Sequence, residues 1–336
     1  MKKLWYSVWS EVLRMKKITR EKFFESIKPY LALIVLTIVF AIGTGGQSLS
    51  IKNIKIVTEQ SLALMLASTG VFFVMTTGMM DLSISGVVCV CCFILAKMGT
   101  INPVLGLALM VMAGVLLGLF NGVITSVLKV PSFLATLCTA YICTGLMTHF
   151  IASSAAMVPI SLYSCNTLEF KLPLIVVLLV LVGILYYLKP FGHYVRMIGS
   201  NETSAHFSAI KVTTIKVLCF VLNGALASVA AFFIGIRAGT AALSTGSDLM
   251  FNVMVALTLG GFPFGGGGKA KLSAPIIGSI TTYVLSNGML LMGVSSTAMS
   301  LIKGSLFLGI VFLTSPTCHR LIDRLHPRKI AKAAES

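Results

Sequence analysis

Charged side chains are scarce in this sequence, and acidic ones are the scarcest. Of the 336 residues only 10 are Asp or Glu, and charged residues make up 11% of the chain, against about 25% in an ordinary soluble domain. So little charge cannot cover a surface that faces water. The composition therefore excludes a soluble enzyme, a disordered chain and a secreted disulfide scaffold.

Apolar residues take the place of charge. They make up 57% of the chain and occur in continuous runs of about 20 residues, the length that a helix needs to cross a bilayer. Strands of a membrane β-barrel would instead alternate over about ten residues. The sequence predicts an all-α membrane protein, a polytopic bundle of about ten transmembrane helices. Because some runs are short or interrupted by Gly and Pro, eight or nine full crossings also fit. The predicted segments are 30–48, 56–77, 82–99, 103–127, 132–150, 172–188, 214–236, 249–263, 273–292 and 297–314.

Basic residues predict the orientation of the bundle. The net charge is +16, and Lys and Arg gather at the chain ends and in short loops. If the N-terminus is cytoplasmic and ten spans alternate, five of the 26 basic residues lie outside, Lys303 lies within the last span, and the other 20 lie inside. Basic residues mark the cytoplasmic side, so both termini are predicted to be cytoplasmic. The outer basic residues are Lys52, Lys55, Lys97, Lys171 and Arg237.

The chain divides into three parts. Residues 1–29 are basic and carry apolar residues at helical spacing, which predicts an amphipathic segment on the cytoplasmic leaflet; a solvated tail also fits. Residues 30–314 form the transmembrane domain, and residues 315–336 form a cytoplasmic tail. No run pairs basic residues with exposed aromatics as nucleic-acid modules do, so the predicted partner is the lipid bilayer and no nucleic acid.

A polar stretch, residues 77–86, interrupts the apolar sequence. Asp81 is the only acidic residue between Glu59 and Glu169. A carboxylate at membrane depth costs a few kcal/mol and normally faces protein or water. Ser83 or Ser85 can cap a helix that restarts there. Two interpretations stay open: a broken helix that lines a pathway, or a cytoplasmic turn between two spans.

Further polar residues lie within the spans. Asn121 can hydrogen-bond a neighbouring helix or meet a polar solute, and the packing role is favoured. Pro131 fits the start of a helix. Thr136, five residues later, can bond its own helix backbone.

The longest predicted inner loop, 189–213, contains the features of a short helix. Ser200 or Asn201 can cap it, and Glu202 in its first turn suits the helix dipole. Such a helix would present a docking surface to a cytoplasmic partner, whereas a solvated loop is the plainer alternative.

No sequence feature predicts a catalytic, metal or nucleotide site. The glycine-rich stretch 260–270 fails as a phosphate-binding loop, because Pro263 and Ala270 occupy positions that require Gly and Ser or Thr. The five histidines are scattered, and six of the eight cysteines lie inside apolar stretches, where a thiol acts as a small hydrophobe. We therefore assign no metal and no cofactor.

Several of these motifs, in this order, resemble the membrane permeases of ABC importers for simple sugars, the ribose/galactose-type branch related to branched-chain amino acid permeases. The family pattern T-G-G-I-D-L-S-V-G is matched by TGMMDLSIS at 77–85, and G-L-x-N-G followed by I-P-x-F-I-A-T-L is matched at 118–122 and 130–137. The family's coupling-loop pattern is matched at several positions between 192 and 210, and N-N-G-L-N-L-L-G-V-S-S at 286–296. The similarity runs from about residue 56 to residue 314.

The chain departs from the family at one place. Where the family often has G-Y-E-L-D, residues 248–252 read DLMFN, so that Met250 and Asn252 replace two carboxylates. This indicates a divergent subgroup.

The resemblance implies a permease that is not itself an enzyme, in the bacterial plasma membrane, that imports a monosaccharide. It implies two cytoplasmic ABC ATPase subunits, an extracytoplasmic solute-binding protein, and a homodimer or a dimer with a sister permease. The implied ATPase-coupling residues are Gly199, Asn201, Glu202, Ala205 and Ser208. The implied translocation-pathway residues are Asp81, Ser83, Asn121, Thr136 and Asn287.

Other substrates and one other transporter class stay open. Nucleosides, autoinducer-type sugars and branched-chain amino acids fit the same architecture. An ion-coupled secondary carrier would need several carboxylates within the membrane or an unwound carbonyl cage. Only Glu59 and Asp81 are acidic between residues 26 and 168, which disfavours that class.

Overall fold

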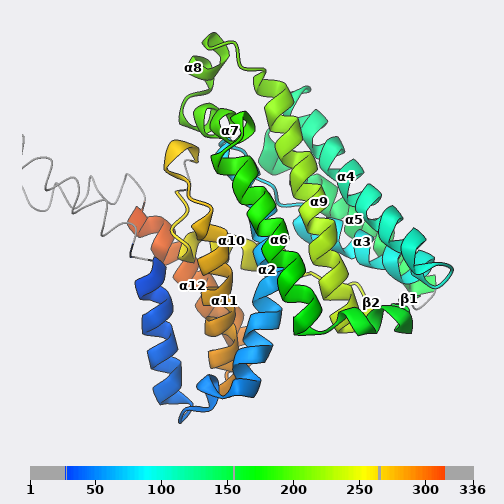
Figure 1. Cartoon of the computed structure of the whole chain (residues 1–336), viewed down its shortest axis with the longest axis vertical. Coiled ribbons are helices and arrows are strands. Elements are labelled where there is room, and N and C mark those ends of the chain that lie inside the picture. Colours follow the sequence, from blue (N-terminus) through cyan, green and yellow to red (C-terminus); the bar gives the residue numbers. More distant parts are fainter. Residues whose placement is uncertain (1–26, 28, 154–155, 264–265, 315–336) are drawn as a thin grey trace, which may run out of the picture.

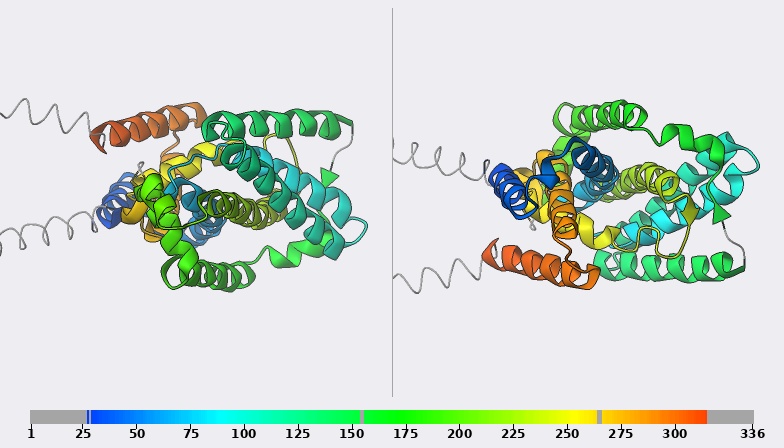
Figure 2. Two further views of the ribbon diagram at one scale, coloured as in Figure 1. Left: turned by 90° about the horizontal axis from the view of Figure 1, so that it is seen from above. Right: turned by 90° about the horizontal axis from the view of Figure 1, so that it is seen from below.

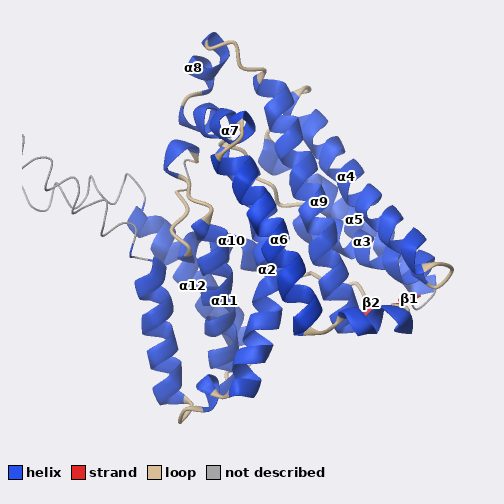
Figure 3. Cartoon of the chain, in the orientation of Figure 1, coloured by secondary structure: helices blue, strands red, loops and turns tan. Residues whose placement is uncertain are grey.

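A computed structural model describes residues 27, 29–153, 156–263 and 266–314. Most of these residues are helical (Figure 3). Apart from residues 27 and 29, the predicted amphipathic segment 1–29 lies outside the described residues, as does the predicted tail 315–336.

Each of the ten predicted apolar segments coincides with a helix. Six helices are long and apolar enough to cross a membrane, and the other four do not meet the same measure over their described residues. The chain is therefore an all-α membrane protein, and the number of crossings stays a prediction. The six are α2 (Ile51–Thr76), α4 (Pro103–Ser126), α5 (Ser132–Ser153), α6 (Leu168–Tyr187), α9 (Val212–Ala238) and α11 (Ser273–Leu291); the four are Pro29–Gly43, α3 (Ile84–Gly99), α10 (Leu249–Leu259) and α12 (Ser296–Thr314).

Short elements connect these helices. They are η1 (Gln47–Leu49), η2 (Ile160–Cys165), α7 (Pro190–Ser200), α8 (Glu202–Phe207), η3 (Gly267–Lys269) and a ribbon of β1 (Ala156–Met157) and β2 (Thr240–Ala241). The two strands pair antiparallel, with Ala156 opposite Ala241. Helices α7 and α8 lie at one end of the bundle and the ribbon lies toward the other (Figure 1). The predicted inner loop 189–213 is thus far from the ribbon that joins two predicted outer loops.

Helices α2 and α9 form the centre of the bundle. Every residue of α2 from Ser61 to Thr76 is buried, as expected for a helix that is apolar on all sides. Helix α4 crosses α9 closely, because a Cβ on Gly114 would meet the carbonyl oxygen of Gly224 and the reverse also holds. Small residues that let two backbones approach are the usual contact between membrane helices.

The remaining helices cover this centre on two sides. Helices α5 and α12 lie along one side, and α6 lies along the opposite side (Figure 2). Both α5 and α12 expose many of their side chains, so they complete the bundle only on their inner faces.

Candidate functional site

The polar stretch between α2 and α3 enters the bundle. Helix α2 ends at Thr76, Gly78 adopts a φ of +84°, and the chain is non-helical until α3 begins at Ile84. Within this break Met80 N–H donates to Ser132 Oγ (3.0 Å) and Leu82 N–H donates to Thr136 Oγ1 (3.0 Å). Hydroxyls at the start of α5 therefore replace the backbone partners that a continuous helix would provide.

The carboxylate of Asp81 is buried at the centre of this break, with 1% of the residue exposed. Its Oδ1 accepts from the N–H (2.7 Å) and the hydroxyl (2.6 Å) of Ser83, and its Oδ2 accepts from Asn223 Nδ2 on α9 (2.6 Å). Hydrogen bonds of this kind are what make a buried carboxylate tolerable. The side chain of Asp81 therefore faces protein on all sides, and the choice between a pathway-lining break and a cytoplasmic turn stays a prediction.

The network extends from Ser83 to two further helices. Asn121 Nδ2 on α4 donates to Ser83 Oγ (2.8 Å), and Thr139 Oγ1 on α5 donates to Asn121 Oδ1 (2.7 Å). Four parts of the chain, the break, α4, α5 and α9, thus share one buried set of polar groups. The packing role that the sequence favours for Asn121 is confirmed.

The structure therefore brings only some of the predicted pathway residues into contact. Asp81, Ser83 and Asn121 form one network, and Thr136 holds the adjacent backbone. Asn287 is buried on α11 and is not bonded to this network. Their assignment to a translocation pathway stays a prediction.

Sequence reasoning missed Asn223, the partner that links Asp81 to α9. Asn223 is an isolated asparagine in the apolar run 214–236, and the same pattern identified Asn121. The sequence therefore contained a signal that could have identified Asn223.

The predicted inner loop contains the expected short helix, α8, and Asn201 rather than Ser200 caps it. Asn201 Oδ1 accepts from Ser204 N–H (2.9 Å). Glu202 forms an ion pair of 2.7 Å with Lys216 on α9. Ala205 is buried beneath the helix, whereas Phe207 at its end is 85% exposed. Sequence reasoning missed Phe207, an exposed aromatic residue within a polar loop.

Contacts of Gly199 and its neighbour join the loop to the bundle. A Cβ at Gly199 would overlap the carbonyl oxygen of Thr76 at the end of α2, and it would lie 2.7 Å from the N atom of Gly267. Gly268 N–H donates to Ser200 Oγ (2.8 Å). Helix α7 thus contacts both the end of α2 and the glycine-rich turn before α11. A movement of α7 would therefore also displace these two segments.

Ser208, the last predicted coupling residue, follows α8. Its hydroxyl donates to the carbonyl oxygen of Ser204 (2.9 Å), so it closes the helix and stays at the surface beside Phe207.

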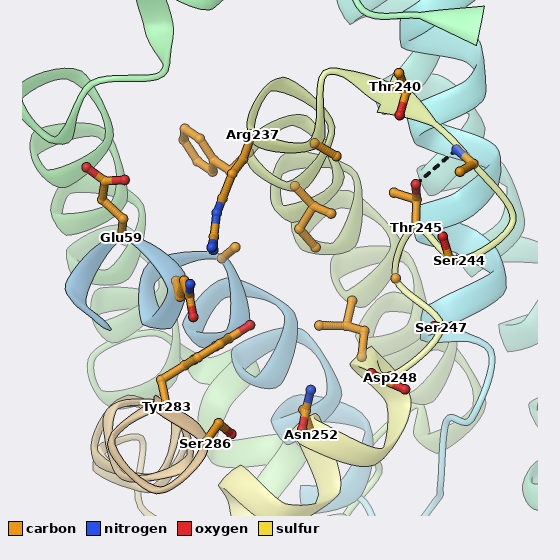
Figure 4. A pocket seen from close by; sticks show the side chains of 18 of the residues that line it. Glu59, Arg237, Thr240, Ser244, Thr245, Ser247, Asp248, Asn252, Tyr283 and Ser286 are labelled. Atoms are coloured by element: carbon orange, nitrogen blue, oxygen red, sulfur yellow. Dashed lines mark hydrogen bonds between the residues drawn. The ribbon is translucent and has the colours of Figure 1, made fainter. Parts of the chain in front are cut away.

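A cavity of about 530 Å³ lies among α2, α6, α9, α10, α11, α12 and the loop that follows β2. None of the predicted site residues lines it. Arg237, Tyr283 and Asn252 point toward the same space (Figure 4). Its polar lining residues are Glu59, Gln60, Lys171, Arg237, Thr240, Ser244, Thr245, Ser247, Asp248, Asn252, Tyr283, Ser286 and Lys303. The available signal was a set of isolated charges near the ends of apolar runs.

Comparison with known proteins places the chain among membrane permeases. The family described as branched-chain amino acid transport system / permease component matches residues 53–314. The ribose import permease protein RbsC of Bacillus subtilis is 30% identical over 312 residues, covering 89% of this chain and 95% of that protein. The ribose import permease protein RbsC of Haemophilus influenzae is 27% identical, covering 80% and 86%.

A second kind of relative is nearly as similar. The autoinducer 2 import system permease protein LsrC of Salmonella typhimurium is 26% identical over 330 residues, covering 93% of this chain and 92% of that protein. No solved structure matches the chain. The family match spans both the buried network of Asp81 and the α7–α8 loop, and the chain therefore belongs to the family of branched-chain amino acid transport system permease components.

Proposed function

We propose that the chain is the membrane-spanning permease subunit of an ATP-driven importer that carries a monosaccharide across the bacterial plasma membrane. The names of its relatives, ribose and autoinducer 2 import permeases, support a sugar-like substrate. The observation that carries the proposal is the placement of α8: a short capped helix stands at one end of the bundle and presents Phe207 outward. Nucleosides and branched-chain amino acids are the alternative substrates.

Helices α7 and α8 are the proposed docking site for a cytoplasmic ATPase subunit. The chain lacks a phosphate-binding loop, so energy from ATP has to arrive from another subunit. An exposed aromatic residue at the tip of a rigid helix is a typical interface anchor. The contacts of α7 with the end of α2 and with residues 266–269 would carry the movement of a docked subunit into the bundle as a rigid-body rotation.

A second permease, identical or a sister, is the proposed partner on the side formed by α5 and α12. Gly145, Gly304 and Gly309 lie within these helices, and a Cβ on any of them would meet nothing within 4 Å. A glycine inside a helix costs about 1 kcal/mol relative to alanine, and none of the described residues fills the space beside these glycines. The close packing of a helix from another permease against these glycines would explain why they are glycines.

The remaining proposals follow from which elements lie at each end of the helical bundle. With α7 and α8 cytoplasmic, the β1–β2 ribbon faces outward, where an extracytoplasmic binding protein would deliver the substrate. The ten spans, the cytoplasmic termini and the pathway role of Asp81 and Asn287 are part of this proposal.

Reconstitution tests the proposed function. The permease, with its ATPase and binding protein, should accumulate labelled sugar in liposomes only when ATP and the binding protein are both present. The mass of the purified complex should correspond to two permeases and two ATPases. Accumulation of sugar by the permease alone, driven by an ion gradient, would refute the proposal.

The charge reversal Glu202→Arg should reduce ATP-driven uptake about fivefold at unchanged insertion. The substituted side chain repels Lys216, and a repulsion of about 1 kcal/mol corresponds to a factor of about five. Glu202 is largely exposed, so the fold should persist. Glu169→Arg is the matched control, an exposed glutamate in the first turn of α6. Equal uptake by both variants would remove Glu202 from the coupling site.

A further inference from the structure

We propose that the cavity between α2, α9, α10 and α12 binds a monosaccharide that carries one negative charge, such as a sugar acid. The inference rests on the proposed function and narrows its substrate class. It places a solute site inside a single permease subunit, near the end of the bundle where the β1–β2 ribbon lies.

The cavity has the size and the lining of a solute site. Small-molecule sites usually enclose about 300–1,000 Å³, and this cavity encloses about 530 Å³. Most of its lining residues carry a charge, a hydroxyl or an amide. Lipid tails cannot satisfy such groups, so water or a polar solute has to occupy the space.

The distribution of basic residues favours an anion. The predicted topology leaves Lys303 and five outer residues away from the cytoplasmic side. Three of these six, Lys171, Arg237 and Lys303, line this one cavity. They face two carboxylates, those of Glu59 and Asp248. Half of the basic residues that do not serve the orientation of the chain thus line this one cavity, where three cations against two carboxylates leave one positive charge in excess.

Neutral partners hold these cations in place. Lys303 Nζ donates to Asn252 Oδ1 (3.0 Å), and Lys171 Nζ donates to Asn166 Oδ1 (2.6 Å). The side-chain oxygen of Gln60, with its amide turned to accept, faces the guanidinium of Arg237. None of the three cavity cations forms an ion pair within 4 Å with an acidic residue of the described chain. The cavity cations are therefore oriented by amides without being neutralised at contact.

Lys303 is the group best placed to bind a carboxylate. An ammonium has three N–H donors, and one of them is used by Asn252. Asp248 at the start of α10 attracts Lys303 electrostatically but lies beyond ion-pair distance, more than 4 Å away. The hydrogen-bond partner Asn252 is a neutral amide, so the positive charge of Lys303 is not neutralised at contact.

Hydroxyl groups elsewhere in the lining suit the rest of a sugar. Tyr283 and Ser286 line the cavity from α11, and Thr245 lines it from the loop after β2. Hydroxyls can donate and accept, as sugar hydroxyls do, and an aromatic ring provides an apolar face for a sugar ring.

Calorimetric titration of the full-length permease in lipid nanodiscs tests the inference. The probes are D-glucuronate and D-glucose, which share a ring and differ by one carboxylate. We expect glucuronate to bind about tenfold more tightly, because a charge-assisted hydrogen bond contributes more than 1.4 kcal/mol, the equivalent of a factor of ten. Equal affinities, or no binding of either probe, would overturn the inference.

Two substitutions identify the cation. Lys303→Gln removes the charge, and Asn252→Asp neutralises it by placing a carboxylate beside Lys303 while the lysine stays. Each should abolish the preference for glucuronate, whereas Lys52→Gln, an exposed outer lysine away from the cavity, should preserve it. If Lys303→Gln does not fold, Asn252→Asp decides, and a preserved preference overturns the inference.

The outcome is separable from that of the proposed function. ATP-driven uptake of a neutral sugar without glucuronate binding would leave the importer intact and remove only this site. If the reconstituted wild-type complex takes up no sugar when ATP is supplied, the proposed function itself is refuted.

Discussion

Asp81→Ala should abolish most ATP-driven uptake and lower the thermal stability of the permease. The carboxylate accepts three hydrogen bonds, two from Ser83 and one from Asn223, at 2.6–2.7 Å. Alanine leaves these donors buried without an acceptor. Each unpaired buried group costs about 1–3 kcal/mol, and a whole protein is stable by only about 5–15 kcal/mol.

Two measurements separate stability from transport. The unfolding midpoint of the purified variant in detergent should fall by at least about 6 °C, since three unpaired donors cost at least about 3 kcal/mol and each kcal/mol corresponds to about 2 °C, the lower end of the range for large domains. Uptake in liposomes, compared at equal inserted protein, should fall at least about tenfold because the break no longer holds α4 and α9 in register. Binding of the ATPase should persist, because α8 lies at the end of the bundle.

An isosteric substitution is the matched control. In Asp81→Asn the Oδ1 still accepts from Ser83, while the new amide faces Asn223. The Oδ1 of Asn223 has no hydrogen-bond partner, so this side chain can turn over and accept from the new amide. Asp81→Asn, and the exchange Asp81→Asn with Asn223→Asp, should therefore retain most of the stability. If Asp81→Asn is as damaging as Asp81→Ala, the charge itself has a role in transport that packing does not explain.

The elements of this fold could be predicted from the sequence because each is determined by local pattern. Apolar runs of sufficient length predicted ten segments, and all ten are helices. The cap of α8 was similarly local, since Asn201 bonds to a residue three positions later. The break at Asp81 was visible because polar residues interrupt an apolar run.

The partners of those residues could not be predicted in the same way. Asp81 and Asn223 are 142 positions apart, and only the crossing of the helices brings them together. The cavity is assembled from six helices and a loop, with charges that each stand alone in the sequence. Lys303 stands alone in an apolar run, so the sequence does not predict its hydrogen-bond partner. Only the packing of α12 against α10 places Asn252 beside it.

Phe207→Asp should weaken binding of the ATPase subunit about thirtyfold or more. Phe207 is 85% exposed, and its ring lies edge-on to that of its neighbour His206, so its apolar surface is little buried by the described part of the chain. Interface anchors of this type contribute at least about 2 kcal/mol, which corresponds to about thirtyfold in affinity. A carboxylate at that position would in addition be desolvated without a partner. Binding of purified ATPase to the permease in nanodiscs measures the effect directly.

The fold of the variant should be unaffected, which makes the measurement specific. Helix α8 is held by the Asn201 cap, by buried Ala205 and by the ion pair of Glu202 with Lys216, and Phe207 takes part in none of these. Ile160→Asp is the matched control, because Ile160 is 86% exposed in η2, in the segment that leads from β1 to α6. Its substitution should leave ATPase binding at the wild-type level and would affect only a partner on the outer side. If both variants weaken ATPase binding equally, the loss of an exposed apolar side chain at any position weakens binding. The α7–α8 end of the bundle is then not the specific docking site of the ATPase subunit.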